Sequence, residues 1–304
     1  MSDNQPTPSP STGVEGAGHQ QEPGWAPREA DFELERVLAA ARRGLFGEEA
    51  AAPTRIGRHR IEARLGAGGM GEVYLGVDES LGRKVAIKLV LPSLHGKQGG
   101  KQGVERLRLE ARALARLSHP NVVQVYEVDE HDGRTYLAME YVEGQTLGAW
   151  LQVESRSWSA ILARFVAAGR GLAAAHAAGV IHRDFKADNV LLAADGRVCV
   201  ADFGLARTEL DVDAAVPGGD GPGAERRSTV GAVGTIRYMP LEQLDAGNVD
   251  ARADQFAYCV ALYEALWSTP PFAIDSVEAR RAALEDDRPT TPPRSAVPRG
   301  LWRV

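Results

Sequence analysis

The chain has 304 residues, of which 44% are apolar, so it is long enough for one large domain or two smaller lobes around a real core. Its net charge of −6 gives no indication of nucleic-acid binding. The chain shows no signal-peptide pattern, and no apolar run reaches the roughly 18 to 20 residues of a membrane span, which predicts a soluble, cytoplasmic protein without a membrane segment. The two cysteines, Cys199 and Cys259, are expected to be reduced core residues rather than a disulfide.

The first 53 residues differ in composition from the rest. Residues 1–28 contain five prolines and four glycines with few apolar side chains, which predicts disorder. Residues 29–53 are expected to form a short helix and a linker, because apolar residues approximate one helical face before two glycines. No partner for this helix can be identified from the sequence.

Residues 54–143 predict a small lobe that is mainly antiparallel sheet. Short runs of alternating or β-branched apolar residues, bounded by glycine, proline or serine, predict strands at 59–66, 71–78, 84–90, 122–130 and 135–142. One helix is expected at 103–119, where apolar residues recur on a single stripe.

Residues 144–304 predict a larger, mainly helical lobe. Apolar helices are expected at 158–180 and 253–266, a hairpin at 190–200 and a polar helix near 275–287. Residues 208–231 are rich in Gly, Pro, Asp and Ala and predict a flexible loop.

The stretch "LGAGGMGEV" places Gly66, Gly68 and Gly71 in a G-x-G-x-x-G-x-V frame. Such glycines let the backbone fold over phosphates and donate N–H groups to their oxygens, although glycines also make ordinary turns. A strand is expected on both sides, which disfavours a dinucleotide fingerprint and favours a hairpin that covers phosphates.

The stretch "VAIK" ends an apolar strand with Lys88, which is either an edge lysine or the partner of an anion. Glu110, beside the apolar stripe of the next helix, is the natural partner. A lysine held by that glutamate could orient the α- and β-phosphates of a nucleotide.

The stretch "HRDFKADN" at 182–189 lies between two apolar runs and concentrates reactive groups. Asp184 can orient an attacking hydroxyl or accept its proton. Lys186 can neutralise charge on a transferring phosphoryl group. Asn189, and Asp202 of "ADFG", are oxygen donors of the kind that Mg²⁺ prefers. Each is ordinary alone, but together, in this order, they predict a catalytic loop.

The set GAGGMG, VAIK, HRDFKADN, DFG and GTIRYMPLEQ resembles the eukaryotic-like (Hanks-type) serine/threonine protein kinases, most closely their bacterial branch, over about residues 56–304. This resemblance implies an α+β fold with two lobes and ATP between them. It implies Lys88 paired with Glu110, Mg²⁺ (or Mn²⁺) on Asn189 and Asp202, and Asp184 as catalytic base. Lys186 marks the Ser/Thr subclass.

The resemblance also implies which residues contact the nucleotide. Met139 would be the gatekeeper, and the hinge backbone that follows it would bind adenine. The implied contacts of the glycine loop, the VAIK strand and the hinge are Gly66, Ala67, Gly68, Gly69, Gly71, Val73, Ala86, Lys88, Met139, Glu140 and Val142.

Other residues of the motifs have supporting roles by the same resemblance. Asp254 would hold the catalytic-loop backbone, His182 would support the loop by packing, and His176 is expected to be a satisfied core histidine. Arg183 would pair with a phosphate on the activation loop, for which Thr229 and Ser228 are the candidates. This implies trans-autophosphorylation in a transient kinase dimer, and protein substrates.

Two departures from the family pattern stand out. "PLE" at 240–242 replaces Ala-Pro-Glu, which moves the proline one residue earlier. The sequence also stops where two further helices are expected, one of which would carry an arginine for Glu242. An unpaired, buried Glu242 would cost several kcal/mol, so we expect an incomplete and less stable large lobe.

Two alternative functions remain open. A pseudokinase or signalling scaffold would bind nucleotide without turnover, but such proteins usually lose the equivalents of Lys88, Asp184 or Asp202, and all three are present. A small-molecule phosphotransferase is disfavoured by Arg183, Lys186 and the GTxxY segment.

Overall fold

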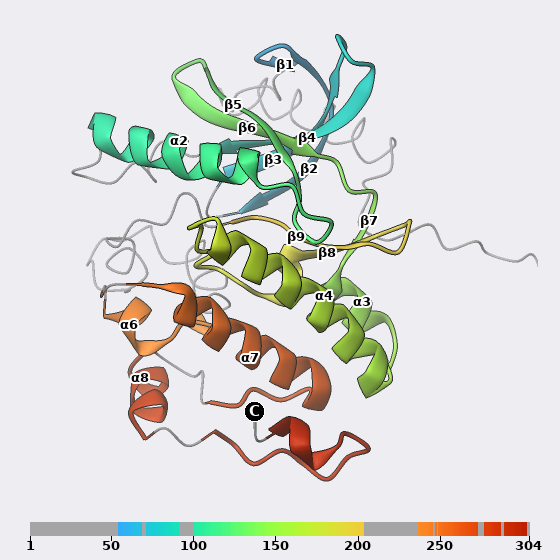
Figure 1. The fold of residues 1–304 in the computed structure, drawn as a ribbon, viewed down its shortest axis with the longest axis vertical. Helices are drawn as coiled ribbons and strands as arrows, with labels where there is room; N and C mark the ends of the chain where they lie inside the picture. Colours follow the sequence, from blue (N-terminus) through green and yellow to red (C-terminus); the bar gives the residue numbers. More distant parts are fainter. Residues whose placement is uncertain are drawn as a thin grey trace, which may run out of the picture.

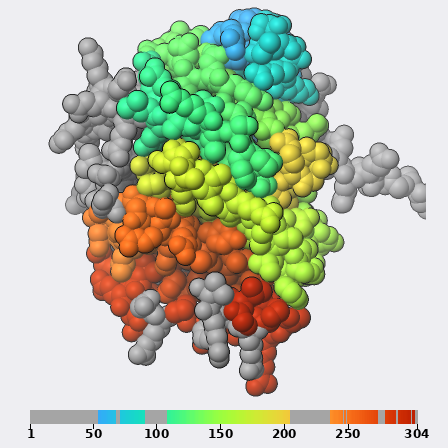
Figure 2. Space-filling model, in the orientation of Figure 1, coloured from blue at the N-terminus to red at the C-terminus, as the bar shows by residue number. Residues whose placement is uncertain are grey.

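The computed structural model describes residues 54–68, 71–90, 100–203, 236–245, 247, 249–272, 277–286 and 289–302. The predictions for residues 1–53, Gly69, the loop at 208–231, Ser228 and Thr229 lie outside this part. The described chain forms the two expected lobes, with the sheet on one side and most helices on the other (Figure 1). In the space-filling view, the small lobe (blue to green) is stacked on the helical lobe (yellow-green to red) (Figure 2).

The sheet of the small lobe is antiparallel throughout, as predicted. Its described strands run in the order β1-β2-β3-β4-β6-β5. Helix α2 (Gly100–Arg116) packs against β5. The strand bounds are β1 Arg55–Ile56, β2 His59–Gly68, β3 Gly71–Asp78, β4 Arg83–Val90, β5 Val125–His131 and β6 Arg134–Glu140.

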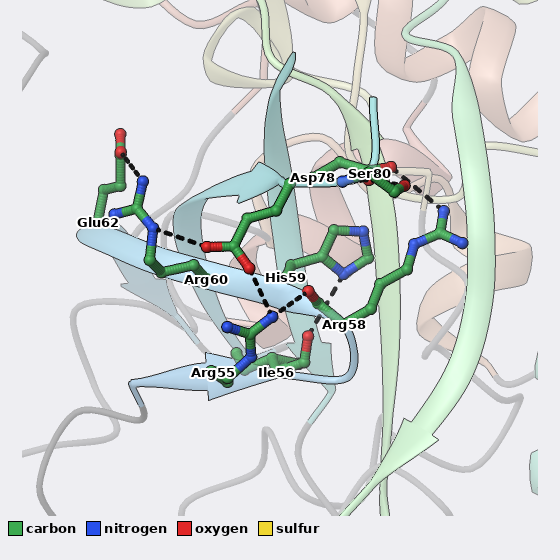
Figure 3. Close-up of polar contacts among 9 residues, drawn as sticks. Arg55, Ile56, Arg58, His59, Arg60, Glu62, Asp78 and Ser80 are labelled. Atoms are coloured by element: carbon green, nitrogen blue, oxygen red, sulfur yellow. Dashed lines mark hydrogen bonds and ion pairs between the residues drawn. The ribbon is translucent and has the colours of Figure 1, made fainter. Parts of the chain in front are cut away.

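A buried polar cluster, drawn in Figure 3, lies at the end of the sheet that carries β1, which is far from the large lobe in Figure 1. The Asp78 carboxylate, 1% exposed, accepts hydrogen bonds from the backbone and hydroxyl of Ser80 and an ion pair from Arg58. His59 is also buried and lies 3.3 Å from the carbonyl of Ile56. These bonds fasten the turn after β3 to the start of β2, so the cluster has a structural role.

The large lobe is built around α4 (Trp158–Ala177) and α7 (Ala251–Trp267), which pack on each other. Their shared core includes Phe165, Leu172 and Phe185. The other elements are β7 Gly144–Thr146, α3 Leu147–Val153, η2 Ala187–Asn189, β8 Val190–Ala193, β9 Val198–Val200, α6 Leu241–Leu244, α8 Val277–Glu285 and η3 Arg299–Trp302. Among the described residues, none of these helices is long and apolar enough to cross a lipid bilayer.

The segment before β5 joins the two lobes. The sequence predicts a strand from residue 122, but β5 starts at Val125, because the N–H of Val123 bonds the carbonyl of Val200 on β9 instead. The N–H of Val200 in turn bonds Asn121. Helix α4 approaches this segment so closely that a side chain at Gly171 would place its Cβ 2.2 Å from the Asn121 carbonyl oxygen.

The cysteines are both free, as expected, but only Cys199 is buried. The prediction that Cys259 is a core residue is wrong. Helix α7 buries Ala257, Val260 and Ala261, and Cys259 falls on its exposed face.

Candidate active site

The catalytic loop is held by one buried carboxylate on α7. Asp254, 1% exposed, accepts the backbone N–H groups of His182 and Arg183, each at 2.7 Å. It also accepts a hydrogen bond from Nε2 of His176 at 2.7 Å. The two backbone bonds fix Arg183 in a left-handed conformation with φ of 63°, which is uncommon for a residue with a side chain. The predicted role of Asp254 is confirmed; His176 is hydrogen-bonded, as predicted, but it is half-buried rather than in the core.

His182 is fully buried and supports the loop from below. Its Nε2 donates to the carbonyl of Ala201 at 2.9 Å, and its Nδ1 accepts the N–H of Asp184 at 3.3 Å. Its ring lies 4.7 Å from that of Phe203 and 5.8 Å from that of Phe185, measured between centroids. A ring with both nitrogens occupied in this way is a structural group, and it ties the catalytic loop to the segment of Asp202.

Three predicted site residues meet at the end of this loop. Nζ of Lys186 lies 3.3 Å from Oδ2 of Asp184. The amide nitrogen of Asn189 donates to the Asp184 carbonyl at 2.7 Å and lies 3.3 Å from Oδ2. The Asn189 amide nitrogen is thus turned to Asp184, which leaves its carbonyl oxygen as the group that can face a cation.

Lys88 reaches the same region from β4, but its partner is Asp202. Lys88 is 7% exposed, which excludes a solvated edge lysine, and its Nζ lies 2.9 Å from Oδ1 of Asp202. Burial opposes ionisation of Asp202, but the charge and hydrogen bond of Lys88, together with the charge of Lys186, outweigh it, so the pKa of this carboxyl lies below its ordinary value. Asp202 is therefore a carboxylate at neutral pH, and its side chain is 39% exposed.

The expected ion pair between Lys88 and Glu110 is not formed, and this prediction is wrong for the present structure. Glu110 is bound by Arg183, whose Nη1 lies 3.0 and 3.1 Å from the two carboxylate oxygens. The reason is geometric: Lys88 and Glu110, both in the small lobe, each have a partner of opposite charge in the large lobe within 3.1 Å. Arg183, expected to bind a phosphate, already has a carboxylate partner.

The residues of the sheet that are predicted to contact the nucleotide lie opposite one another, or close together, on adjacent strands. Strands β2 and β3 form a hairpin in which Gly66 pairs with Val73 and Gly68 with Gly71. Ala67, between them, pairs with Glu72. A side chain at Gly71 would place its Cβ 2.2 Å from the carbonyl oxygen of Leu89, so the strand requires glycine there.

The next strands continue this surface. Val73 pairs with Lys88, and Ala86 pairs with Met139 on β6. A mainly apolar pocket lies between these strands, α2 and the Asp202 segment. Its lining includes Lys88, Val90, Leu114, Met139, Asp202 and Phe203.

This combination of two lobes, a glycine hairpin and a supported catalytic loop matches a known family. The family model for the protein kinase domain matches residues 59–294. The chain belongs to the protein kinase family.

Curated relatives and solved structures are consistent with this family. The serine/threonine-protein kinase PknL of Mycobacterium tuberculosis is 38% identical over 221 residues, 72% of this chain and 51% of PknL. The probable serine/threonine-protein kinase PknA2 of Bifidobacterium longum is 36% identical over 221 residues, 72% of this chain and 28% of that protein. The chain therefore spans about half or less of these relatives. The crystal structure of the M. tuberculosis PknI kinase domain aligns with a TM-score of 0.58 at 26% identity, covering 78% of this chain and 87% of that domain.

The kinase domain contains a link that sequence reasoning missed, between α6 and the catalytic loop. Nε2 of Gln243 donates to the carbonyl of Arg183 at 2.7 Å. Gln243 belongs to the motif GTIRYMPLEQ, but the motif itself gives no signal that this side chain contacts the loop. The backbone of Arg183, the residue before Asp184, is thus bonded to both α6 and α7, through its carbonyl and its N–H.

The shifted proline of the kinase domain is accommodated without loss. Pro240 directly precedes α6, and its carbonyl accepts the N–H groups of Gln243 and Leu244. The missing N–H of proline has no helical partner at this position, so the turn tolerates the change. Just before it, Arg237 and Tyr238 both bond Glu264 of α7, at 3.0 and 2.8 Å.

Glu242 lacks an ion-pair partner among the described residues, as predicted, but it is not buried. It is only half-buried, which moderates the expected cost. A buried charge in this region is instead Arg280 of α8, which is 0% exposed and donates to the carbonyl of Met239 at 3.3 Å. Burial lowers the pKa of Arg280 to about 10, and its guanidinium lies 5.1 Å from the ring of Phe272.

Proposed function

We propose that this kinase domain transfers the γ-phosphoryl group of ATP to serine or threonine hydroxyls of protein substrates. The observation that carries the proposal is the convergence of Asp184, Lys186 and Asn189 in one hydrogen-bonded group beside the pair of Lys88 and Asp202. The relatives named as serine/threonine-protein kinases support the same activity.

The side chains present suit a divalent cation. Asn189 and Asp202 would hold Mg²⁺ (or Mn²⁺) through a carbonyl and a carboxylate oxygen, and the lowered pKa of Asp202 favours this. When bound, the ion would neutralise phosphate charge.

The remaining roles follow from position. Asp184 would orient the substrate hydroxyl and accept its proton, and Lys186 would stabilise charge on the transferring group. The backbone of the hairpin around Gly66 and Gly71 would cover the phosphates. Lys88 would orient them, and the linker from Glu140 to Val142 would bind adenine.

We also propose activation by phosphorylation at Thr229 or Ser228, in trans within a transient dimer. The support is Arg183, whose Nη1 binds Glu110 and whose fork carries further donors that an anion could use. A cytoplasmic location is proposed on the sequence alone.

One experiment tests the activity. Transfer of radiolabel from ATP·Mg²⁺ should be seen to the protein itself and to a generic basic protein, and Asp184→Asn should reduce it at least about a hundredfold. Equal transfer by the wild type and Asp184→Asn would refute the proposal. Nucleotide-dependent thermal stabilisation without transfer would favour the non-catalytic scaffold. Phosphopeptide mapping of active protein tests Thr229 separately.

A further inference from the structure

Arg197, in the turn between β8 and β9, is bound to the linker that connects the lobes, residues 140–143. Nη2 of Arg197 lies 2.8 Å from Oε1 of Glu140, the last residue of β6. Asp195 orients Arg197, because its carboxylate accepts both the Nε of Arg197, at 2.8 Å, and the Arg197 backbone N–H, at 3.0 Å. These hydrogen bonds raise the pKa of Arg197 above its ordinary value, so it stays charged.

The linker is fastened to the same hairpin at two further points. The N–H of Ala194 donates to the carbonyl of Glu143 at 2.8 Å. Strand β7 then pairs with β8, and Gly144 lies opposite Ala193. A Cβ at Gly144 would lie 2.0 Å from the carbonyl oxygen of Leu192, so the two strands meet too closely for any side chain there. The linker is thus bonded to the β8–β9 hairpin at these points, and Arg197 binds Glu140, the first residue of the linker.

The open end of this hairpin carries the two proposed cation ligands. Asn189 directly precedes β8, and Asp202 follows β9 by two residues. The N–H of Ala201 bonds the Asn189 carbonyl at 2.9 Å, so both ligands are joined at this end. At about 3.3 Å per residue, the four residues of β8 span roughly 13 Å from these ligands to the turn with Arg197.

We propose that Arg197 is a positioning residue for the nucleotide. By holding Glu140, it fixes the adenine-binding linker at a set distance from Asn189 and Asp202, so that the base and the phosphates bind together. This inference rests on the proposed function, in which the linker binds adenine. The pair is partly exposed, with side-chain exposures of 41% for Arg197 and 18% for Glu140, so its effect on overall stability should be small. Its effect on ATP binding can therefore be measured separately.

A double-mutant cycle of Arg197→Met and Glu140→Gln tests the inference in the full chain. We expect each single change to weaken ATP·Mg²⁺ binding about five- to tenfold, and the double variant to bind no worse than either. Tripolyphosphate·Mg²⁺, which lacks the base, should bind all four proteins within about twofold. Arg252→Met is the matched control, because Arg252 pairs with Asp250 on the surface and its side chain is 85% exposed. It should not change ATP binding.

Multiplicative losses in the double variant, or equal losses for tripolyphosphate, would overturn the role of Arg197. Absence of ATP binding by the wild type would instead remove the proposed function. Amide hydrogen exchange at residues 141–143, measured without nucleotide, tests whether Arg197 anchors the linker, and it does so whether or not the wild type binds ATP. Faster exchange in Arg197→Met supports it, and unchanged exchange overturns it.

Discussion

The ion pair between Glu110 and Arg183 connects α2 to the catalytic loop, and removing either charge should weaken the folded state. Nη1 of Arg183 lies 3.0 and 3.1 Å from the two carboxylate oxygens, and the side chains are 16% and 21% exposed. A hydrogen bond between charged groups contributes about 1.5–3 kcal/mol. Solvent screens part of this for partly exposed groups. We therefore expect a coupling free energy of about 1–2 kcal/mol.

Urea unfolding of the nucleotide-free protein measures this coupling. The variants are Glu110→Gln, Arg183→Gln and their combination, and the double variant should be little less stable than either single one. A second cycle combines Glu110→Gln with Lys88→Met. Its coupling should be near zero, because Lys88 contacts Asp202.

The opposite result would refute the reasoning. If Glu110 couples to Lys88 by about 1 kcal/mol or more and not to Arg183, then the pair expected from the sequence is the one present in solution. Coupling to neither would show that solvent screening cancels the contact between Glu110 and Arg183.

Three further predictions concern catalysis, packing and pH. Gln243→Leu should lower kcat about tenfold and leave KM for ATP within about twofold, because the peptide before Asp184 loses its hydrogen bond at 2.7 Å. Steady-state kinetics measure both constants. An unchanged kcat would show that Asp254 alone suffices to position the catalytic loop. Gly171→Ala should lower the free energy of unfolding by about 2–4 kcal/mol, because its Cβ would lie 2.2 Å from a backbone oxygen. Gly169→Ala is the control: its nearest contact would be at 3.4 Å, so thermal unfolding should show no change or a gain of up to about 1 kcal/mol in stability. Cys199 is buried, which raises the pKa of its thiol to about 11, and Cys259 is exposed, so at pH 8 a thiol reagent should label Cys259 alone. Because the unfolded thiol titrates near 8.5, the stability linked to Cys199 is full below that pH and is lost as pH rises toward 11, and Cys199→Ala should reduce this alkaline loss.

Elements with strong local signals could be predicted from the sequence. The strand expected at 71–78 is β3, Gly71–Asp78, and the strand expected at 84–90 is β4, Arg83–Val90. In both, β-branched and apolar residues lie between turns that contain glycine, and this local pattern matches the tertiary environment. The catalytic loop was predictable for a related reason: its residues are close in sequence, so their spacing limits where they can lie.

Contacts between the lobes could not be predicted in the same way. The sequence supplies Lys88, Glu110, Arg183 and Asp202 as charges that must find partners, but two pairings satisfy all four. Which one forms depends on the separation of α2 from β4, which is set by packing over many residues. Short elements such as β7 were missed because their pairing with β8 comes from tertiary contact rather than from propensity.

Helix α8 shows that burial, too, could not be predicted from the sequence pattern. Its composition predicts a polar helix, yet Arg280 is fully buried against Phe256 and Phe272. An arginine can bury its apolar stem and stack its guanidinium on rings, so a polar pattern does not define an exposed face. Only the packing of α8 against α6 and α7 determines this position.

The two ion pairs between the lobes also limit how the site can rearrange. The backbone of Arg183 is bonded to Asp254 and Gln243, so its side chain cannot follow a movement of α2 far. For Lys88 and Glu110 to pair with each other alone, each must leave its partner in the large lobe. A cation at Asp202 and an anion at Arg183 would compensate those two losses. Two ligands of opposite charge would therefore favour this exchange. A metal ion bound with the nucleotide and a phosphate on the activation loop, which are the groups of the proposed function, have these charges.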